Sequence, residues 1–148
     1  MNANVNGLIH PYLFFEGRCE EAIEFYKKAL KAEVQMVMRY KESPEPPPPG
    51  CVPDGCENKI LHGQIRIGQA VVMMSDGRCS GKANFEGFSL SLSYSTEADV
   101  DRYFNALAEG GKIIMPLART FYSSRFGMLA DRFGVGWMLI RPNEMPPK

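Results

Sequence analysis

The sequence has no excess of either charge, because 17 lysine and arginine residues balance 17 aspartate and glutamate residues in a chain of 148. Nucleic acids and anionic membranes attract proteins with a clustered basic excess, so neither partner is expected. No apolar run approaches the roughly 20 residues that a membrane-spanning helix needs. The first residues, MNANVNGLIHPYLFF, lack the basic start and small-residue cleavage site of a secretion signal. These absences predict a soluble, cytoplasmic protein.

Familiar catalytic motifs are also absent. The sequence has no glycine-rich phosphate loop, no nucleotide fingerprint and no Ser-His-Asp arrangement. The four cysteines (Cys19, Cys51, Cys56 and Cys79) are scattered, and without a secretion signal we expect them to be reduced thiols. Cys51, Cys56 and His62 have the spacing C-x4-C-x5-H, which is wider than the paired spacings of zinc sites and lacks a fourth ligand. We therefore expect no zinc site at these residues.

Hydrophobic periodicity predicts alternating strands and helices in one domain, residues 1–148. Apolar positions recur at helical spacing from 18 to 32, and Thr96 is an expected N-cap for a second helix that stops at Gly110-Gly111. Alternating or continuous apolar runs predict strands at 8–15, 34–40, 59–67, 70–75, 88–95, 112–117, 126–131 and 136–141. Between them, the proline-rich segment 41–57 predicts an extended surface loop, either a lid over a pocket or a simple excursion.

An internal repeat is the main structural signal. A shift of 77 residues places Leu13 on Leu90 and Tyr26 on Tyr103, so strand and helix positions coincide at one offset. One such half could not bury both its helix and its sheet alone. The sequence therefore predicts an α+β fold of two βαβββ modules, about 7–76 and 86–142, forming a curved mixed sheet with helices outside.

Several longer segments resemble a known family. They are PYLFFEGRCEEAIEFYKKAL, HGQIRIGQAVVMMSD (62–76), SGK (80–82) and TFYSSRFGMLADRFGVGWML (120–139). Together they are similar to the PhnB-like branch of the vicinal-oxygen-chelate superfamily, which also contains glyoxalase I, bleomycin- and fosfomycin-resistance proteins and extradiol dioxygenases. The resemblance implies the glyoxalase/bleomycin-resistance fold, a homodimer, and a small organic ligand held by the concave sheet.

In metal-using relatives, each module offers one His, Glu or Gln ligand from its first strand and one from its last. His10 lies close to the first of these places, but Met73 and Met138 fall at or near the two last-strand places, and Phe88 and Ser89 begin the other first strand. Thioether and phenyl groups do not hold a hard divalent cation, so we expect no bound metal and no other cofactor. A metal-dependent lyase, isomerase or dioxygenase acting on a vicinal-oxygen substrate remains the alternative.

Eight residues are candidates for lining a ligand pocket. Each has an alternative reading as a structural residue, such as a turn after a strand for Ser75 and Asp76 or a dimer contact for His62. The candidates are His10, His62, Met73, Ser75, Asp76, Phe121, Tyr122 and Met138. Trp137 and most of the nine methionines are expected in the core, although a soft methionine lining of a pocket is the other possibility. Cys19 is at the start of the first expected helix. Two readings stay open there: the helix dipole lowers the pKa of the thiol, or packing buries the side chain.

Overall fold

The computed structural model describes residues 6–45, 48–50 and 52–143. The chain divides into two compact units, one of residues 1–23 and 32–82 and the other of residues 24–31 and 83–148. No helix among the described residues combines the length and the apolar character that crossing a membrane would require.

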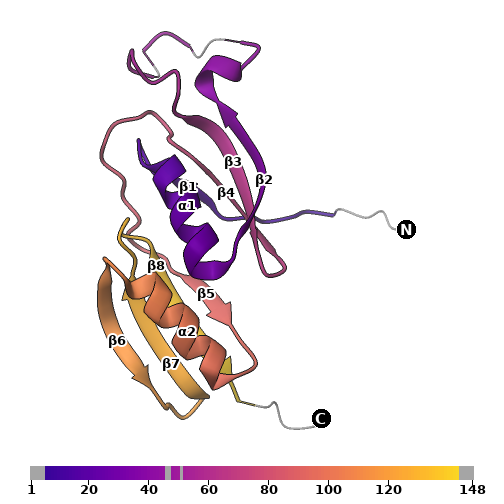
Figure 1. Ribbon diagram of the computed structural model, residues 1–148, viewed down its shortest axis with the longest axis vertical. Coiled ribbons are helices and arrows are strands. Elements are labelled where there is room, and N and C mark those ends of the chain that lie inside the picture. The colour runs from indigo at the N-terminus through magenta and orange to yellow at the C-terminus, as the bar shows by residue number, and fades with distance from the viewer. Residues whose placement is uncertain (1–5, 46–47, 51, 144–148) are drawn as a thin grey trace. The chain divides into compact units, whose positions relative to one another are not determined.

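The first module contains a four-stranded sheet and one long helix (Figure 1). Its elements are β1 (Tyr12–Phe14), α1 (Cys19–Leu30), β2 (Glu33–Arg39), the short 3-10 helix η1 (Tyr40–Glu42), β3 (Ile60–Ile67) and β4 (Ala70–Ser75). The strand order is β1-β4-β3-β2, in which β1 runs parallel to β4 and the other pairs are antiparallel. We call this sheet A.

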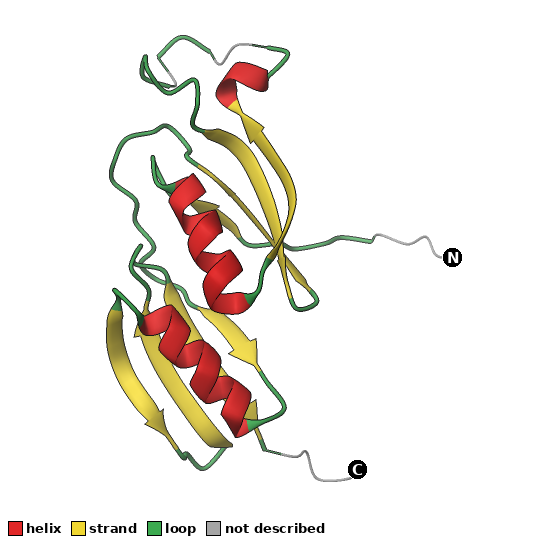
Figure 2. Cartoon of the chain, in the orientation of Figure 1, coloured by secondary structure: helices red, strands yellow, loops and turns green. Residues whose placement is uncertain are grey.

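The second module repeats this plan, as the secondary-structure colouring in Figure 2 shows. Its elements are β5 (Leu90–Ser93), α2 (Glu97–Ala108), β6 (Lys112–Ala118), β7 (Ser123–Ala130) and β8 (Gly136–Pro142). Sheet B has the order β5-β8-β7-β6, with β5 parallel to β8. The hydroxyl of Thr96 accepts a hydrogen bond from the Asp99 amide at 3.1 Å, so the predicted N-cap of α2 is confirmed.

Each sheet has one buried face and one open face. On sheet A, Leu13, Ile65 and Met74 are at most 2% exposed, whereas the residues next to them along each strand are half-buried or exposed, apart from Ser75, which is buried. On sheet B, Leu129 and Leu139 are buried in the same way. This alternation is the pattern of a sheet packed on one side only.

The predicted fold class, an α+β fold of two βαβββ modules, is confirmed. In the described part of the chain the hydrogen-bonded strands belong to two sheets, one in each module. A single concave surface shared by both modules stays a prediction.

The first strand is shorter than predicted. Residues 8–15 were expected to form it, but β1 covers only Tyr12–Phe14, and the preceding Leu8 and Ile9 are 80% and 98% exposed. Pro11 has no amide hydrogen and contributes only its carbonyl, which accepts a bond from the Met73 amide. The apolar run therefore extends beyond the residues that can pair with β4.

Candidate functional site

The open face of sheet A carries a row of neighbouring side chains from all four strands. The cross-strand register places Tyr12 beside Met73, Met73 beside Gln64, and Gln64 beside Met36. Side chains that are directly opposite in a sheet lie on the same face and contact one another. Tyr12 and Met36 are exposed, and Met73 and Gln64 are half-buried, so the row is accessible in the single chain.

Tyr12 and His62 form a polar pair on this face. The Tyr12 hydroxyl lies 3.0 Å from His62 Nδ1, and the two rings lie 5.6 Å apart. Phe14 extends the aromatic surface, with its ring 5.0 Å from that of Tyr12. His62 therefore has a phenol rather than a carboxylate as its partner. A neutral imidazole and a phenol can each donate or accept a hydrogen bond, which suits recognition of a polar group on a ligand.

The open face of sheet B has the equivalent row, but with different chemistry. Ser91 lies beside Met138, Met138 beside Met128, and Met128 beside Met115. Three of these four positions are methionine, so this row on sheet B is flexible and apolar. In the row on sheet A, two of the four positions, Tyr12 and Gln64, are polar. Met73 and Met138 both lie on the last strands of their modules, β4 and β8.

The expectation that most methionines fill the core is wrong. Only Met74 is fully buried among the methionines of the described residues. The others are half-buried or exposed and have their cross-strand neighbours on the open faces: Met36, Met38, Met73, Met115, Met128 and Met138. The sequence pattern could not separate the two uses, because alternation does not say which face of a strand is covered.

Ser75 and Asp76 belong to unit 1, and both are buried. The side chain of Asp76 is fully buried, and its two carboxylate oxygens accept hydrogen bonds at 2.8 Å from the amides of Gly17, Cys19 and Ile60. Ser75 is 3% exposed, and its hydroxyl accepts a bond from the Gly77 amide. These contacts favour the structural reading of both residues over the ligand-binding one.

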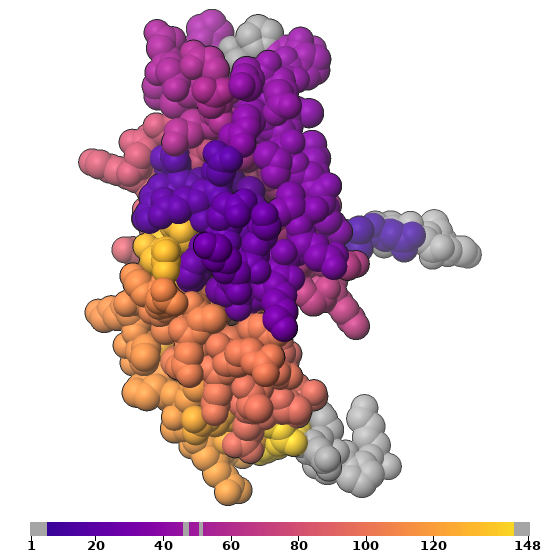
Figure 3. Space-filling model, in the orientation of Figure 1, coloured from indigo at the N-terminus to yellow at the C-terminus, as the bar shows by residue number. Residues whose placement is uncertain are grey.

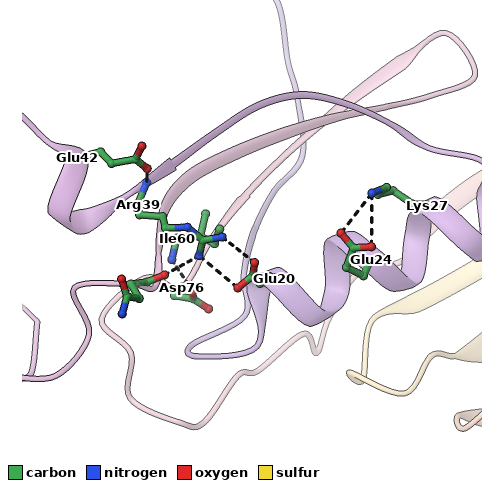
Figure 4. Close-up of polar contacts among 8 residues, drawn as sticks. Glu20, Glu24, Lys27, Arg39, Glu42, Ile60 and Asp76 are labelled. Atoms are coloured by element: carbon green, nitrogen blue, oxygen red, sulfur yellow. Dashed lines mark hydrogen bonds and ion pairs between the residues drawn. The ribbon is translucent and has the colours of Figure 1, made fainter.

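A second set of polar contacts surrounds Arg39 at the end of β2 (Figure 4). Its guanidinium forms a bidentate pair with Glu20 on α1, with distances of 2.6 and 3.2 Å, and also donates to the Asn58 carbonyl at 2.6 Å. The Arg39 amide donates to the Glu42 carboxylate at 2.7 Å, which caps η1. The hydrogen bond from Arg39 lowers the pKa of Glu20. Arg39 thereby attaches both ends of the segment 40–58 to α1.

The remaining histidine and aromatic candidates come from other segments of the chain. His10 is half-buried in the segment before β1. Phe121 and Tyr122 lie in the turn between β6 and β7, with rings 4.9 Å apart, and are 94% and 43% exposed. In the single chain Phe121 therefore contributes a protruding ring rather than a pocket wall.

Unit 1 has a pocket of about 390 Å³ beside the proline-rich segment, which we call the loop cavity. A lid over a pocket was one of the two predictions for that segment. The lining of the loop cavity includes Tyr40, Lys41, Val52, Pro53 and Cys56. These residues belong to η1 and the proline-rich segment, which gathers at one end of unit 1 (Figure 3). The prolines indicated a loop, but no periodic pattern indicates which residues of a loop border a pocket.

The cysteines have different environments. Cys19 is fully buried at the start of α1, and burial, together with the carboxylates of Asp76 and Glu20, raises the pKa of its thiol. The helix dipole therefore does not activate it, and the packing reading holds. Cys51 lies outside the described residues, so its part of the C-x4-C-x5-H spacing is not seen. Among the residues that the structure describes, no cluster of three or more His, Cys, Asp and Glu side chains could hold a metal ion.

Taken together, the strand order of the two modules and the open sheet faces define the class of protein: a paired βαβββ fold of the vicinal-oxygen-chelate type. The family model described as 3-demethylubiquinone-9 3-methyltransferase matches residues 8–140. The chain belongs to this family, the PhnB-like branch of that superfamily.

Individual relatives agree with this assignment. The protein YjdN of Escherichia coli K12 is 36% identical, and the match covers 93% of this chain and 97% of YjdN. The solved structure of a PhnB protein from Bacillus cereus is 30% identical, covers 91% of this chain and 99% of that one, and has a TM-score of 0.75. The fosfomycin resistance protein FosX from Mesorhizobium loti has a TM-score of 0.62, with coverage of 95% and 94%, but is only 15% identical, so it shows a shared fold alone.

Proposed function

We propose that the protein binds a small organic molecule on the open face of sheet A. The observation that carries this proposal is the Tyr12–His62 pair, held at 3.0 Å within a row of methionine and aromatic side chains. Small-molecule sites combine a mostly apolar surface with a few placed polar groups. Methionine side chains adapt to irregular shapes and contact aromatic rings favourably. A planar or aromatic molecule with one hydrogen-bonding group fits this chemistry best.

We further propose that the chain works as a homodimer. Single exposed apolar residues are ordinary, but here one edge strand of each sheet exposes several of them: Val34, Met36 and Val37 on β2, and Ile113, Ile114 and Met115 on β6. A second copy of the chain that covers such edges would remove apolar surface from water.

The metal-dependent alternative lacks a donor set in the described residues. His10 would need partners from the last strands of the modules, where Met73 and Met138 offer thioethers. A methyltransferase activity, which the name of the family model would suggest, lacks support as well, because no adenosylmethionine-binding glycine motif follows a strand in the sequence. Binding without a metal is therefore the function that the site supports best.

Binding can be tested by following the methionine methyl groups in NMR spectra of protein labelled with ¹³C at those methyls. Aromatic, dicarbonyl and glycopeptide compounds are titrated separately, and one class is expected to shift the signals of Met36, Met38 and Met73. The signal of the buried Met74 serves as an internal control. Tyr12→Phe removes only the hydroxyl and should weaken binding about tenfold, the effect of one lost hydrogen bond. Tyr103→Phe, on α2, is the matched variant and should bind normally.

Two results would contradict the proposal. One is the absence of any shift at these methyls with all three classes of compound at millimolar concentration. The other is stoichiometric metal in protein purified without chelator, lost together with ligand binding in His10→Ala.

A further inference from the structure

Two cysteine side chains from separate segments of unit 1 lie against one another. Cys56 is in the loop before β3, and Cys79 is in the turn after β4. The Cys56 side chain neighbours Cys79 closely enough to raise the pKa of the Cys79 thiol, and neither cysteine is in a disulfide. Residues 57–78, which contain the whole β3–β4 hairpin, separate them in sequence.

The backbone around Cys56 is fixed by its neighbours. Its carbonyl accepts a hydrogen bond from the Lys59 amide at 3.0 Å, and the Glu57 carbonyl accepts one from the Lys41 amide at 2.9 Å. The Lys59 ammonium donates to the Gly17 carbonyl at 2.8 Å. The segment that carries Cys56 is therefore attached to both η1 and the end of β1.

The backbone around Cys79 is fixed independently. Its amide donates to the Asp76 carbonyl at 2.8 Å, and its φ of 55° lies in the left-handed region that non-glycine residues rarely adopt. The amides on either side of it, those of Arg78 and Ser80, donate to the Glu16 carboxylate at 3.3 and 3.0 Å. These bonds hold the residue in a conformation that an unconstrained turn would avoid.

The segment that carries Cys56 and the turn that carries Cys79 are joined at the buried Asp76. The Asp76 carboxylate accepts a hydrogen bond from the Ile60 amide. The Asp76 amide in turn donates to the Ile60 carbonyl at 2.9 Å. The proximity of the thiols is therefore a consequence of hydrogen bonds that hold both segments, and not of two flexible side chains meeting by chance.

The two thiols have different surroundings. Cys56 lines the loop cavity, and both side chains are half-buried rather than enclosed. Burial, and then the hydrogen bond with Cys56, raise the pKa of Cys79 to about 12, so Cys79 is a neutral thiol at neutral pH. Cys19, the third cysteine of the described residues, is fully buried.

We propose that Cys56 and Cys79 are a reversible modification site that closes to a disulfide when the surrounding thiol–disulfide balance becomes oxidising. A low-molecular-weight disulfide such as oxidised glutathione is the oxidant. The Cys56 thiolate attacks it, forming a mixed disulfide and releasing one reduced glutathione. Cys79 then loses its proton to solvent, and its sulfur attacks Cys56 Sγ and releases the second glutathione. One oxidised glutathione thus becomes two reduced molecules as two protein thiols become one disulfide.

Closure would alter the lining of the loop cavity, because the Cys56 side chain would be tied to the turn after β4. This site is separate in chemistry from the proposed ligand-binding face of sheet A, so either proposal can fail without the other.

The test uses the full chain, first reduced, then equilibrated in glutathione buffers of rising oxidised fraction, and finally alkylated. Cleavage before aspartates separates Cys51 from Cys56 at Asp54 and releases Cys79 in the peptide that begins at Asp76. The expected product is a linked pair of the peptides 54–75 and 76–98, which reduction separates. Wild type and Cys51→Ser should both form it, and Cys56→Ser and Cys79→Ser should not.

Peptide mapping of the wild-type protein identifies which cysteines are linked, so the test does not depend on whether the variants fold. A linkage of Cys51 to either cysteine, a bond between two chains, or glutathione adducts without the linked peptides at any ratio of the buffer would each overturn the proposal.

Discussion

At the scale of single residues, the two buried aspartates of the structure act as anchors for neighbouring segments. Asp76 accepts bonds from three backbone amides in unit 1. In unit 2, Asp131 accepts bonds from the Phe133 and Val135 amides on one oxygen, and from the Tyr26 hydroxyl and the Trp137 indole on the other. A buried carboxylate is tolerated only when such donors replace its water. The role of Asp131 as a buried anchor was not predicted from the sequence.

Tyr26→Phe should therefore destabilise the protein by roughly 1.5–3 kcal/mol, the usual effect of removing a hydrogen bond to a charged group. The hydroxyl lies 2.5 Å from Asp131 Oδ2, and its loss leaves Trp137 as the remaining side-chain donor recorded on that oxygen. Urea unfolding followed by tryptophan fluorescence measures the change. Tyr94→Phe, whose ring keeps its stacking on Tyr103 at 4.7 Å, is the control and should change stability by less than about 0.5 kcal/mol. Equal effects of the two variants would contradict the anchoring role.

At the scale of elements, the third strand of each module has a glycine on its helix-facing side. Gly63 in β3 and Gly127 in β7 are both buried. A Cβ on Gly127 would lie 2.7 Å from Phe104 Cε2 on α2 and 2.9 Å from a Leu117 methyl. A Cβ on Gly63 would meet its nearest atom, the end of the Ile23 side chain on α1, at 3.2 Å. The absence of a side chain lets each helix approach its sheet closely, more so in the second module.

Replacement by alanine should show this difference. Gly127→Ala is expected to cost about 1–3 kcal/mol, because a buried aromatic ring must move, and Gly63→Ala should cost clearly less. Gly7→Ala, where the added carbon meets no atom within 4 Å, is the neutral control. The three free energies of unfolding from urea titrations give the order directly. An effect of Gly63→Ala as large as that of Gly127→Ala would show that close helix packing is not the cause.

At the scale of the whole molecule, the exposed apolar residues predict self-association. Light scattering coupled to gel filtration should give twice the mass of one chain at micromolar concentration. Phe121→Ser, which changes a ring that is 94% exposed, should shift the equilibrium toward the single chain, whereas Arg102→Ala on the polar side of α2 should not. A mass of one chain at every concentration up to the millimolar range would remove the dimer from the proposal.

Much of the architecture was predictable from the sequence, because local pattern determines it. The 77-residue repeat, the helical stripes and the Thr96 cap depend on residues that are close in the chain, and the structure confirms the two βαβββ modules that they predict. The buried position of Trp137 was also foreseen. Strand ends were less predictable, since β1 begins only at Tyr12, directly after Pro11, which has no amide hydrogen to donate.

The placement of candidate site residues was decided by contacts between segments that are distant in the chain. His62 and Tyr12 are 50 residues apart, and their pairing depends on β1 and β3 both lying beside β4. Asp76 looked equally suitable for a pocket edge, but its position beside three amide groups makes it structural. The sequence alone thus determined the elements and their order, through side-chain periodicity and backbone preferences. Only the tertiary structure decided which face of each strand stayed open and which thiols met, because strand pairing and burial join residues that no local pattern connects.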